Sequence, residues 1–206
     1  IEAFVEAVKV DPQTIELHFA LGSLFRRRGE TDRAIRMHQN LIEREDLKQE
    51  LKLQALAELG QDYLKAGLLD RAEAVFDKLR DSELGEEAKR NLLEIYQLEK
   101  HWEKAIAIAS ELPDFASHKE IAEYHCELAA AEMIRSRRDL AAGYLQTALE
   151  RNRKCVRASL LWGDMLLQEE QWEAAIASWQ RIEQQDPAYL ALVAQRLLGA
   201  FRKLDR

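Results

Sequence analysis

The chain has 206 residues, of which 47% are hydrophobic and 33% charged, with only three prolines and eight glycines. This composition excludes a disordered chain, and abundant Ala, Leu, Glu and Arg without alternating β-branched runs predicts an all-α protein. The net charge of −7 makes nucleic acid an unfavourable partner, and no stretch approaches the roughly 18 apolar residues of a membrane span.

A pattern of two helices joined by a short turn recurs along the chain. Phe4, Ala7 and Pro12 fit the end of a truncated unit at residues 1–14, so we expect the chain to be a piece of a longer polypeptide. The single predicted domain, 1–206, then continues with full repeats at 15–48, 53–86, 86–119, 122–155 and 156–189. Residues 190–206 are predicted to form the first helix of a further repeat, with an exposed apolar flank.

The repeats align on one position of the first helix, called here the anchor position. It is occupied by Gly22, Gly60, Leu93, Ala129 and Gly163, which lie 38, 33, 36 and 34 residues apart. A period near 34 residues, with an alanine in every second helix, resembles the tetratricopeptide repeat. Those alanines are Ala34, Ala72, Ala105, Ala141 and Ala175.

Two further positions of the repeat favour aromatic residues, and this chain follows them in part. The first is occupied by Phe25, Tyr63 and Tyr96, with Glu132 and Leu166 as departures. The second is occupied by Phe76 and Trp179, with His38, Ala109 and Leu145 as departures. Pro187 closes the fifth full repeat, as the pattern requires.

Small residues at the anchor position predict close packing of two antiparallel helices. We expect Gly22 to face Ala34 across such a pair, with Gly29 in the turn between them. Each pair leaves one apolar face uncovered and must stack on the next, which predicts a right-handed α-solenoid. The cost of Gly22 in a helix, about 1 kcal/mol relative to Ala, is then offset by packing.

The sequence carries no motif for catalysis or metal binding. Cys126 and Cys155 belong to no C-x-x-C pair, so they are interpreted as reduced packing residues, and no cofactor is expected in these residues. His125 and Cys126 are neighbours on a helix and point about 100° apart, which is unsuited to a shared metal. No Ser-His-Asp signature or phosphate-binding glycine loop is present, so the chain is predicted not to be an enzyme.

In repeats of this kind the first helices line the concave surface, where a protein segment is expected to bind. The helical period selects as partner-binding candidates Phe19, Ser23, Arg26, Gln61, Arg90, Glu94, Met133 and Asp164. The same period also places Cys126 on this surface. Chaperone-binding members of the family hold a peptide carboxylate with Lys and Asn at such positions, and their absence here disfavours that class.

Two basic clusters lie at equivalent ends of first helices. Arg26, Arg27 and Arg28 form one, and Arg135, Arg137 and Arg138 form the other; Arg151, Arg153, Lys154 and Arg157 follow. Cations at a helix C-terminus favour the helix dipole, which explains the clusters as capping. A basic patch for an acidic partner segment or a membrane surface is the alternative.

Three stretches carry a closer resemblance. "LGSLFRRRGETDRAIRMHQNLI", "LGQDYLKAGLLDRAEAVFDKL" and "YHCELAAAEM" resemble the bacterial lipopolysaccharide assembly protein B family, along essentially the whole chain. The resemblance implies an adaptor at the cytoplasmic face of the inner membrane that presents the lipid A deacetylase to the protease FtsH. Members have an N-terminal membrane anchor and a C-terminal rubredoxin-like zinc module, neither of which is found in these residues. Cys126 and Cys155 do not correspond to the zinc ligands of that module.

Two other functions stay open from the sequence. Similar repeats precede the catalytic domain of O-linked N-acetylglucosaminyltransferases, although these residues hold no sugar-nucleotide site. The chain could also be a generic protein-interaction scaffold. Flanking sequence distinguishes the glycosyltransferase from the adaptor, because a membrane span and two C-x-x-C pairs accompany only the adaptor.

Overall fold

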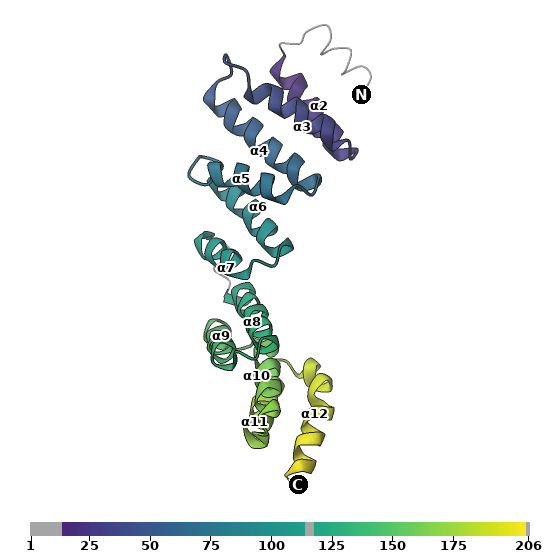
Figure 1. Ribbon diagram of the computed structural model, residues 1–206, viewed down its shortest axis with the longest axis vertical. Helices are drawn as coiled ribbons and strands as arrows, with labels where there is room; N and C mark the ends of the chain where they lie inside the picture. Colours follow the sequence, from purple (N-terminus) through teal and green to yellow (C-terminus); the bar gives the residue numbers. More distant parts are fainter. Residues whose placement is uncertain (1–13, 114–117, 205–206) are drawn as a thin grey trace. The chain divides into compact units, whose positions relative to one another are not determined.

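Helices follow one another along the chain, and no strand occurs among the residues that the structure describes. The computed structural model describes residues 14–113 and 118–204. Its helices, shown in Figure 1, are α2 (Ile15–Arg27), α3 (Thr31–Ile42), α4 (Gln49–Lys65), α5 (Leu69–Leu79), α6 (Gly85–Leu98), α7 (Trp102–Glu111), α8 (His118–Ile134), α9 (Arg138–Arg151), α10 (Val156–Gln168), α11 (Trp172–Gln185), the short 3₁₀ helix η2 (Pro187–Tyr189) and α12 (Leu190–Lys203). The all-α tetratricopeptide solenoid class is confirmed.

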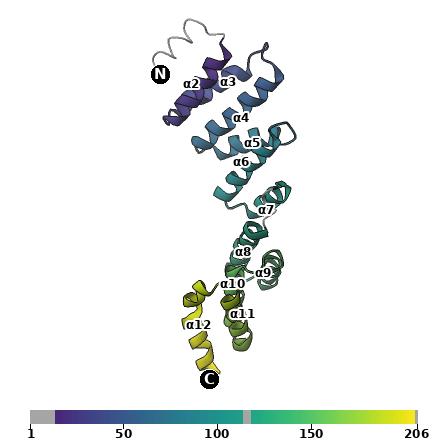
Figure 2. The ribbon, with the colours of Figure 1, turned by 180° about the vertical axis from the view of Figure 1, so that it is seen from behind.

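The chain divides into two compact units, Ile1–Lys100 and His101–Arg206. In the first unit α2 pairs with α3 and α4 with α5, and α6 packs on α5. In the second unit α8 pairs with α9 and α10 with α11, while α7 packs on α8 and α12 on α11. The same pairs can be followed from behind in Figure 2.

First helices of successive pairs also contact each other inside each unit, since α2 touches α4 and α8 touches α10. The predicted repeat boundaries and the single domain stay predictions, and the boundary between the units falls inside the predicted repeat 86–119. Phe4, Ala7 and Pro12 lie outside the described residues.

The turn inside each repeat has the same backbone conformation in all five copies. One residue, seven positions after the anchor, has a positive φ: Gly29 (80°), Gly67 (72°), Lys100 (57°), Ser136 (58°) and Glu170 (59°). The left-handed region costs a non-glycine residue free energy because Cβ approaches the following carbonyl. The predicted turn at Gly29 is therefore confirmed. The residue with positive φ occupies the same position in each of the five repeats.

Hydrogen bonds close these turns in the manner of a Schellman motif. The backbone N–H of Gly29 donates to the carbonyl oxygen of Arg26 at 3.0 Å, and that of Glu30 donates to Phe25 at 2.9 Å. The second of these bonds recurs as Leu68 to Tyr63, Arg137 to Glu132 and Gln171 to Leu166. They satisfy carbonyl groups that the helix end would otherwise leave without a partner.

Replacing Ser136 by glycine is expected to raise the free energy of unfolding by about 0.5 kcal/mol, because glycine adopts φ near +60° without strain. The reciprocal change, Gly29→Ser, is expected to lower it by about 1 kcal/mol. Urea denaturation followed by circular dichroism measures both. Equal effects of the same sign at the two positions would show that turn strain does not control stability here.

Each glycine at an anchor position lies against a large ring of the following helix. A Cβ on Gly60 would come within 2.6 Å of Cζ of Phe76, and a Cβ on Gly22 or Gly163 would collide with the ring of His38 or Trp179. The expectation that Gly22 faces Ala34 stays a prediction, since the three atoms nearest to a Cβ on Gly22 all belong to His38. The ring that covers each glycine comes sixteen residues later, at the second aromatic position, and His38 there replaces an aromatic side chain.

The repeated alanines of the second helices are fully buried. Ala34, Ala72, Ala105, Ala141 and Ala175 all have 0% exposure. A larger side chain at these positions would have no space, so the pattern of small residues reports close helix packing rather than chemistry. Glu132, which departs from the aromatic pattern, is buried as well and accepts a hydrogen bond from Arg135 at 2.6 Å.

Helix α12 buries one face and exposes another. Val193 and Ala200 are buried, whereas Leu192 and Leu198 are each more than half exposed, beside the half-exposed Tyr189. The exposed apolar flank expected at residues 190–206 is thus present. No helix within the described part of the chain combines the length and the apolar character that crossing a bilayer requires.

Candidate functional site

A hollow of about 520 Å³ opens on the first helices of unit 1. Residues from α2, α4 and α6 line it: Arg26, Arg27, Gln61, Leu64, Lys65, Glu94 and Leu98. Three of the predicted partner-binding residues, Arg26, Gln61 and Glu94, thus come together in one place. We call these seven residues the unit 1 groove.

The unit 1 groove mixes exposed charge with exposed apolar surface. Arg27, Lys65 and Glu94 are exposed, and the side chain of Leu98 is 60% exposed. An apolar patch with charges of both signs around it suits a peptide segment, because burial gives affinity and charge gives orientation. No group in this hollow is arranged as a nucleophile with its base.

Arg26 forms the floor of the groove and ties α2 to α4. Its Nη1 lies 2.8 Å from Oδ1 of Asp62, and its Nη2 lies 2.6 Å from Oε2 of Glu58. Nη1 also donates to the carbonyl oxygen of Glu58 at 3.1 Å. Burial lowers the pKa of the Arg26 guanidinium, but the hydrogen bonds to Glu58 and Asp62 outweigh it and raise the pKa overall. Arg26 is therefore a structural contact between adjacent repeats as well as a groove residue.

Asp62 connects this contact to the helix behind it. Its side chain has 0% exposure, and Oδ2 lies 2.5 Å from Nδ1 of His38, which is equally buried. Phe19 packs beside the same imidazole, with ring centroids 6.0 Å apart, and Ser23 donates to Oε2 of Glu58 at 3.4 Å. Phe19 and Ser23 thus support the floor of the groove from α2 and do not line it.

The remaining predicted residues of unit 1 differ in their surroundings. Gln61 donates to Oδ1 of Asn91 at 2.7 Å and so links α4 to α6. Arg90 is exposed and lies 2.8 Å from Oε1 of Glu86, one helical turn away, outside the groove. Glu94 is exposed within it.

In unit 2 neither of the two predicted residues, Met133 and Asp164, lines the two hollows described below. Met133 packs against the core of α8, α9 and α10. Oδ1 of Asp164 lies 2.8 Å from Nε of Arg196 on α12, and burial raises the pKa of the Asp164 carboxyl. Cys126, also expected on the concave surface, has 0% exposure, so that assignment is wrong. A partner-binding role for Met133 and Asp164 stays a prediction.

A larger hollow of about 930 Å³ lies in unit 2, where no predicted site residue lines it. Its walls come from α8, the last residues of α9 and α11, the turn before α10, α10, and the region of η2 and α12. The lining residues are Lys119, Glu123, Arg151, Asn152, Lys154, Val156, Arg157, Leu160, Gln185, Asp186, Tyr189 and Leu192. The basic run from Arg151 to Arg157 was the signal in the sequence that pointed here.

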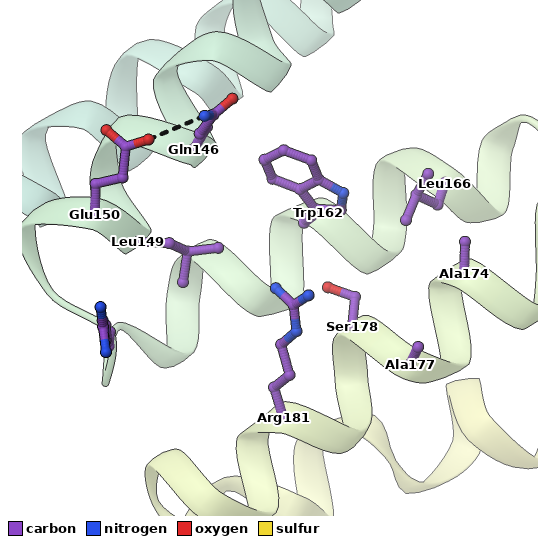
Figure 3. A pocket seen from close by; sticks show the side chains of 10 residues that line it. Gln146, Leu149, Glu150, Trp162, Leu166, Ala174, Ala177, Ser178 and Arg181 are labelled. Atoms are coloured by element: carbon purple, nitrogen blue, oxygen red, sulfur yellow. Dashed lines mark hydrogen bonds between the residues drawn. The ribbon is translucent and has the colours of Figure 1, made fainter.

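A third hollow, of about 640 Å³, lies on α9, α10 and α11. Figure 3 shows the indole of Trp162 projecting between Gln146 of α9 and Arg181 of α11. Gln146 donates to Glu150 at 2.9 Å on one rim. Leu149, Leu166, Ala174 and Ala177 add to its apolar lining. We favour the unit 1 groove as the candidate site because three predicted partner-binding residues line it, whereas none lines this hollow.

The basic clusters are largely used in ion pairs. Nε of Arg28 lies 3.0 Å from Glu30, Arg135 and Arg137 both contact Glu132, and Arg138 pairs with Glu169. Within the first cluster Arg27 lines the groove.

Comparison with known families supports the repeat assignment. Family models described as tetratricopeptide repeat match residues 17–50 and 126–189. The matched residues overlap the first, fourth and fifth predicted repeats.

Similarity to curated proteins extends along the whole chain. Lipopolysaccharide assembly protein B of Escherichia coli K12 is 36% identical over 210 residues, covering 100% of this chain and 54% of that protein. The protein of the same name from Haemophilus influenzae is 34% identical over 198 residues, covering 93% of this chain and 49% of that protein. The chain thus spans about half the length of the curated relatives it matches. The repeat fold and this similarity indicate a protein-interaction repeat region.

Two solved structures share the fold. The crystal structure of MamA protein has a TM-score of 0.52 and 16% identity, covering 86% of this chain and 94% of that one. YrrB, described as a tetratricopeptide-repeat protein with an unusual peptide-binding site, has a TM-score of 0.51 and 19% identity, covering 95% and 98%.

Proposed function

We propose that this chain, in which two stretches match tetratricopeptide-repeat models, binds a protein segment in the unit 1 groove as part of a lipopolysaccharide assembly adaptor. By similarity to lipopolysaccharide assembly protein B, the adaptor would present the lipid A deacetylase to the membrane protease FtsH. It would act at the cytoplasmic face of the inner membrane, held there by a segment outside these residues.

One observation supports the binding site in particular. Exposed residues from three consecutive first helices, α2, α4 and α6, converge on the same hollow. Beneath them Arg26 and Gln61 are held by Asp62 and Asn91, so the surface is pre-formed. A pre-formed groove loses little conformational freedom when a segment binds, which favours affinity.

A double variant tests the groove without disturbing its floor. Arg27→Glu with Leu98→Asp changes exposed side chains only, and we expect it to weaken capture of purified deacetylase about 10-fold by removing contacts in the groove. Arg36→Glu is the matched control, because Arg36 is an exposed arginine of the same unit outside the groove. Surface plasmon resonance measures binding, and circular dichroism checks that all three proteins are folded.

Two results would contradict the proposal. Unchanged binding by the double variant, with weakened binding by Arg36→Glu, would move the site to another face. Failure of the wild-type chain to bind either deacetylase or FtsH, while a photo-crosslinker at residue 98 captures a different protein in cells, would replace the partners but keep the groove.

A further inference from the structure

Three potential metal ligands converge in unit 2, at the edge of its large hollow. Glu123 and Cys126 lie one turn apart on α8, and Cys155 immediately precedes α10. One donor atom from each of the three lies within 4.8 Å of the others. The Sγ atoms of Cys126 and Cys155 are 3.7 Å apart, and Sγ of Cys155 is 3.5 Å from Oε1 of Glu123.

The packing around these residues fixes where the two sulfur atoms lie. Cys126 and Cys155 are 0% and 1% exposed, in the core formed by α8, α9 and α10. Asn152 holds the turn before α10, because its carbonyl accepts from the N–H of Cys155 at 2.9 Å and its side chain accepts from Lys154 at 3.0 Å. The packing of α8 against α10 and the turn at Asn152 therefore hold the two thiols next to each other.

Two of the three donor separations match those of a tetrahedral zinc ion, and the third is within 4.8 Å. Zn–S bonds of about 2.3 Å and Zn–O bonds of about 2.0–2.2 Å at tetrahedral angles place two sulfurs about 3.8 Å apart. They place sulfur and oxygen about 3.5 Å apart by the same geometry. The observed 3.7 Å and 3.5 Å agree with both values.

We propose that Glu123, Cys126 and Cys155 bind a zinc ion, with a fourth position open toward the hollow. Glu123 lines that hollow and is only partly buried, which provides a route for the ion and for a water ligand. Two thiolates and a carboxylate would bring three negative charges, against two on zinc. Nη1 of Arg157 lies 3.9 Å from Oε2 of Glu123 and supplies a compensating positive charge.

A zinc ion here would tie consecutive repeats together. It would join the middle of α8 to the start of α10, the two first helices that line the large hollow. Metal binding would then add to the stability of unit 2, because the unfolded chain has no such preformed site. The proposal does not depend on the identity of the protein partner.

Cobalt(II) replaces zinc as a spectroscopic probe in the test. The 206-residue chain holds only two cysteines, so a thiolate-to-cobalt absorption band reports this site alone. We expect the reduced wild-type chain to bind one Co²⁺, to release it on addition of Zn²⁺, and to melt at higher temperature with Zn²⁺ than without.

Three variants assign the ligands. Cys126→Ser is expected to abolish the cobalt band, and Glu123→Gln to weaken binding about 10-fold or more. Glu127→Gln is the matched control, since Glu127 lies one turn along α8 and contacts Arg157 at 2.7 Å but is outside the donor set. Circular dichroism checks that each variant is folded. If Cys126→Ser does not fold, Glu123→Gln still tests the site.

Three outcomes would overturn the proposal. The first is no cobalt band in the reduced chain, and the second is a band that survives Cys126→Ser. The third is oxidation of the two thiols to a disulfide in a protein whose reduced form takes up no zinc; the pair would then be a redox site.

Discussion

Leucine in place of Gly60 is expected to lower the free energy of unfolding by about 3 kcal/mol, because its side chain has no space beside Phe76. Even a Cβ at this position would lie 2.6 Å from the ring, so α4 and α5 must separate or Phe76 must leave its rotamer. Urea denaturation followed by circular dichroism measures the change.

The same substitution made together with Phe76→Ala tests the cause. Phe76→Ala alone is expected to cost about 3–5 kcal/mol, because it empties a fully buried site. If the leucine fills that space, the double variant is more stable than the sum of the single changes by about 2 kcal/mol. Additive effects would refute direct packing between positions 60 and 76.

Gly143→Ala serves as the control for glycine itself. Gly143 lies within α9, and a Cβ there would meet no atom within 4 Å. Alanine is expected to raise the free energy of unfolding by about 1 kcal/mol through helix propensity. If Gly60→Leu and Gly143→Ala both destabilise the protein, the glycines are needed for backbone flexibility and not because a side chain has no space.

Removal of the Asp62 carboxylate is expected to be equally severe. Asp62→Ala would leave Arg26 and His38 without their shared partner in a buried place, at a cost of about 3–5 kcal/mol. The loss has two parts, since Asp62 of α4 contacts both Arg26 of α2 and His38 of α3; Arg26 would keep its contacts with Glu58. Thermal and urea unfolding of the purified chain measure it.

Glu86→Ala is the comparison for an exposed ion pair. Glu86 and Arg90 are 59% and 41% exposed, and their separation is 2.8 Å. The change is expected to cost no more than about 0.5 kcal/mol, because solvent screens such pairs. A loss at Asp62 as small as that at Glu86 would show that the buried contacts around Arg26 do not hold α2 and α3 to α4.

Repetition made most of the architecture predictable from the sequence. The anchor spacings placed the helix pairs, and the same spacings recur in the five residues with positive φ. Only two of those five are glycines, so composition alone would have missed Lys100, Ser136 and Glu170. Alignment to Gly29 and Gly67 locates them, since backbone conformation follows repeat register.

Contacts between side chains were harder to predict. Arg26 was expected on the concave surface by helical period, but period says nothing about the carboxylates at Glu58 and Asp62 that hold it. Asp164 was expected there as well, and its pairing with Arg196 depends on how α12 packs. The exposed face of a helix can be predicted from the sequence of that helix alone. Its ion pairs can be predicted only when the position of the neighbouring helix is known.

The cysteines illustrate the same limit over a longer distance. Cys126 and Cys155 are 29 residues apart and belong to no recognised metal spacing. Their sulfurs meet because α8 and the start of α10 occupy neighbouring positions in successive repeats. Repeat proteins bring together residues about one period apart, so a period-wide spacing of ligands is the signal to search for.

The ring over each anchor glycine has a consequence for the inheritance of these repeats. Where the anchor is glycine, the residue sixteen positions later is His38, Phe76 or Trp179; Leu93 is instead followed by Ala109 and Ala129 by Leu145. Within each repeat, a small residue at one of these two positions is thus paired with a larger residue at the other. Recombination that joined the helix of Leu93 to the helix of Phe76 or Trp179 would produce a collision, and joining the helix of Gly60 to that of Ala109 would leave a void. The helices of these unlike pairs must therefore be exchanged together.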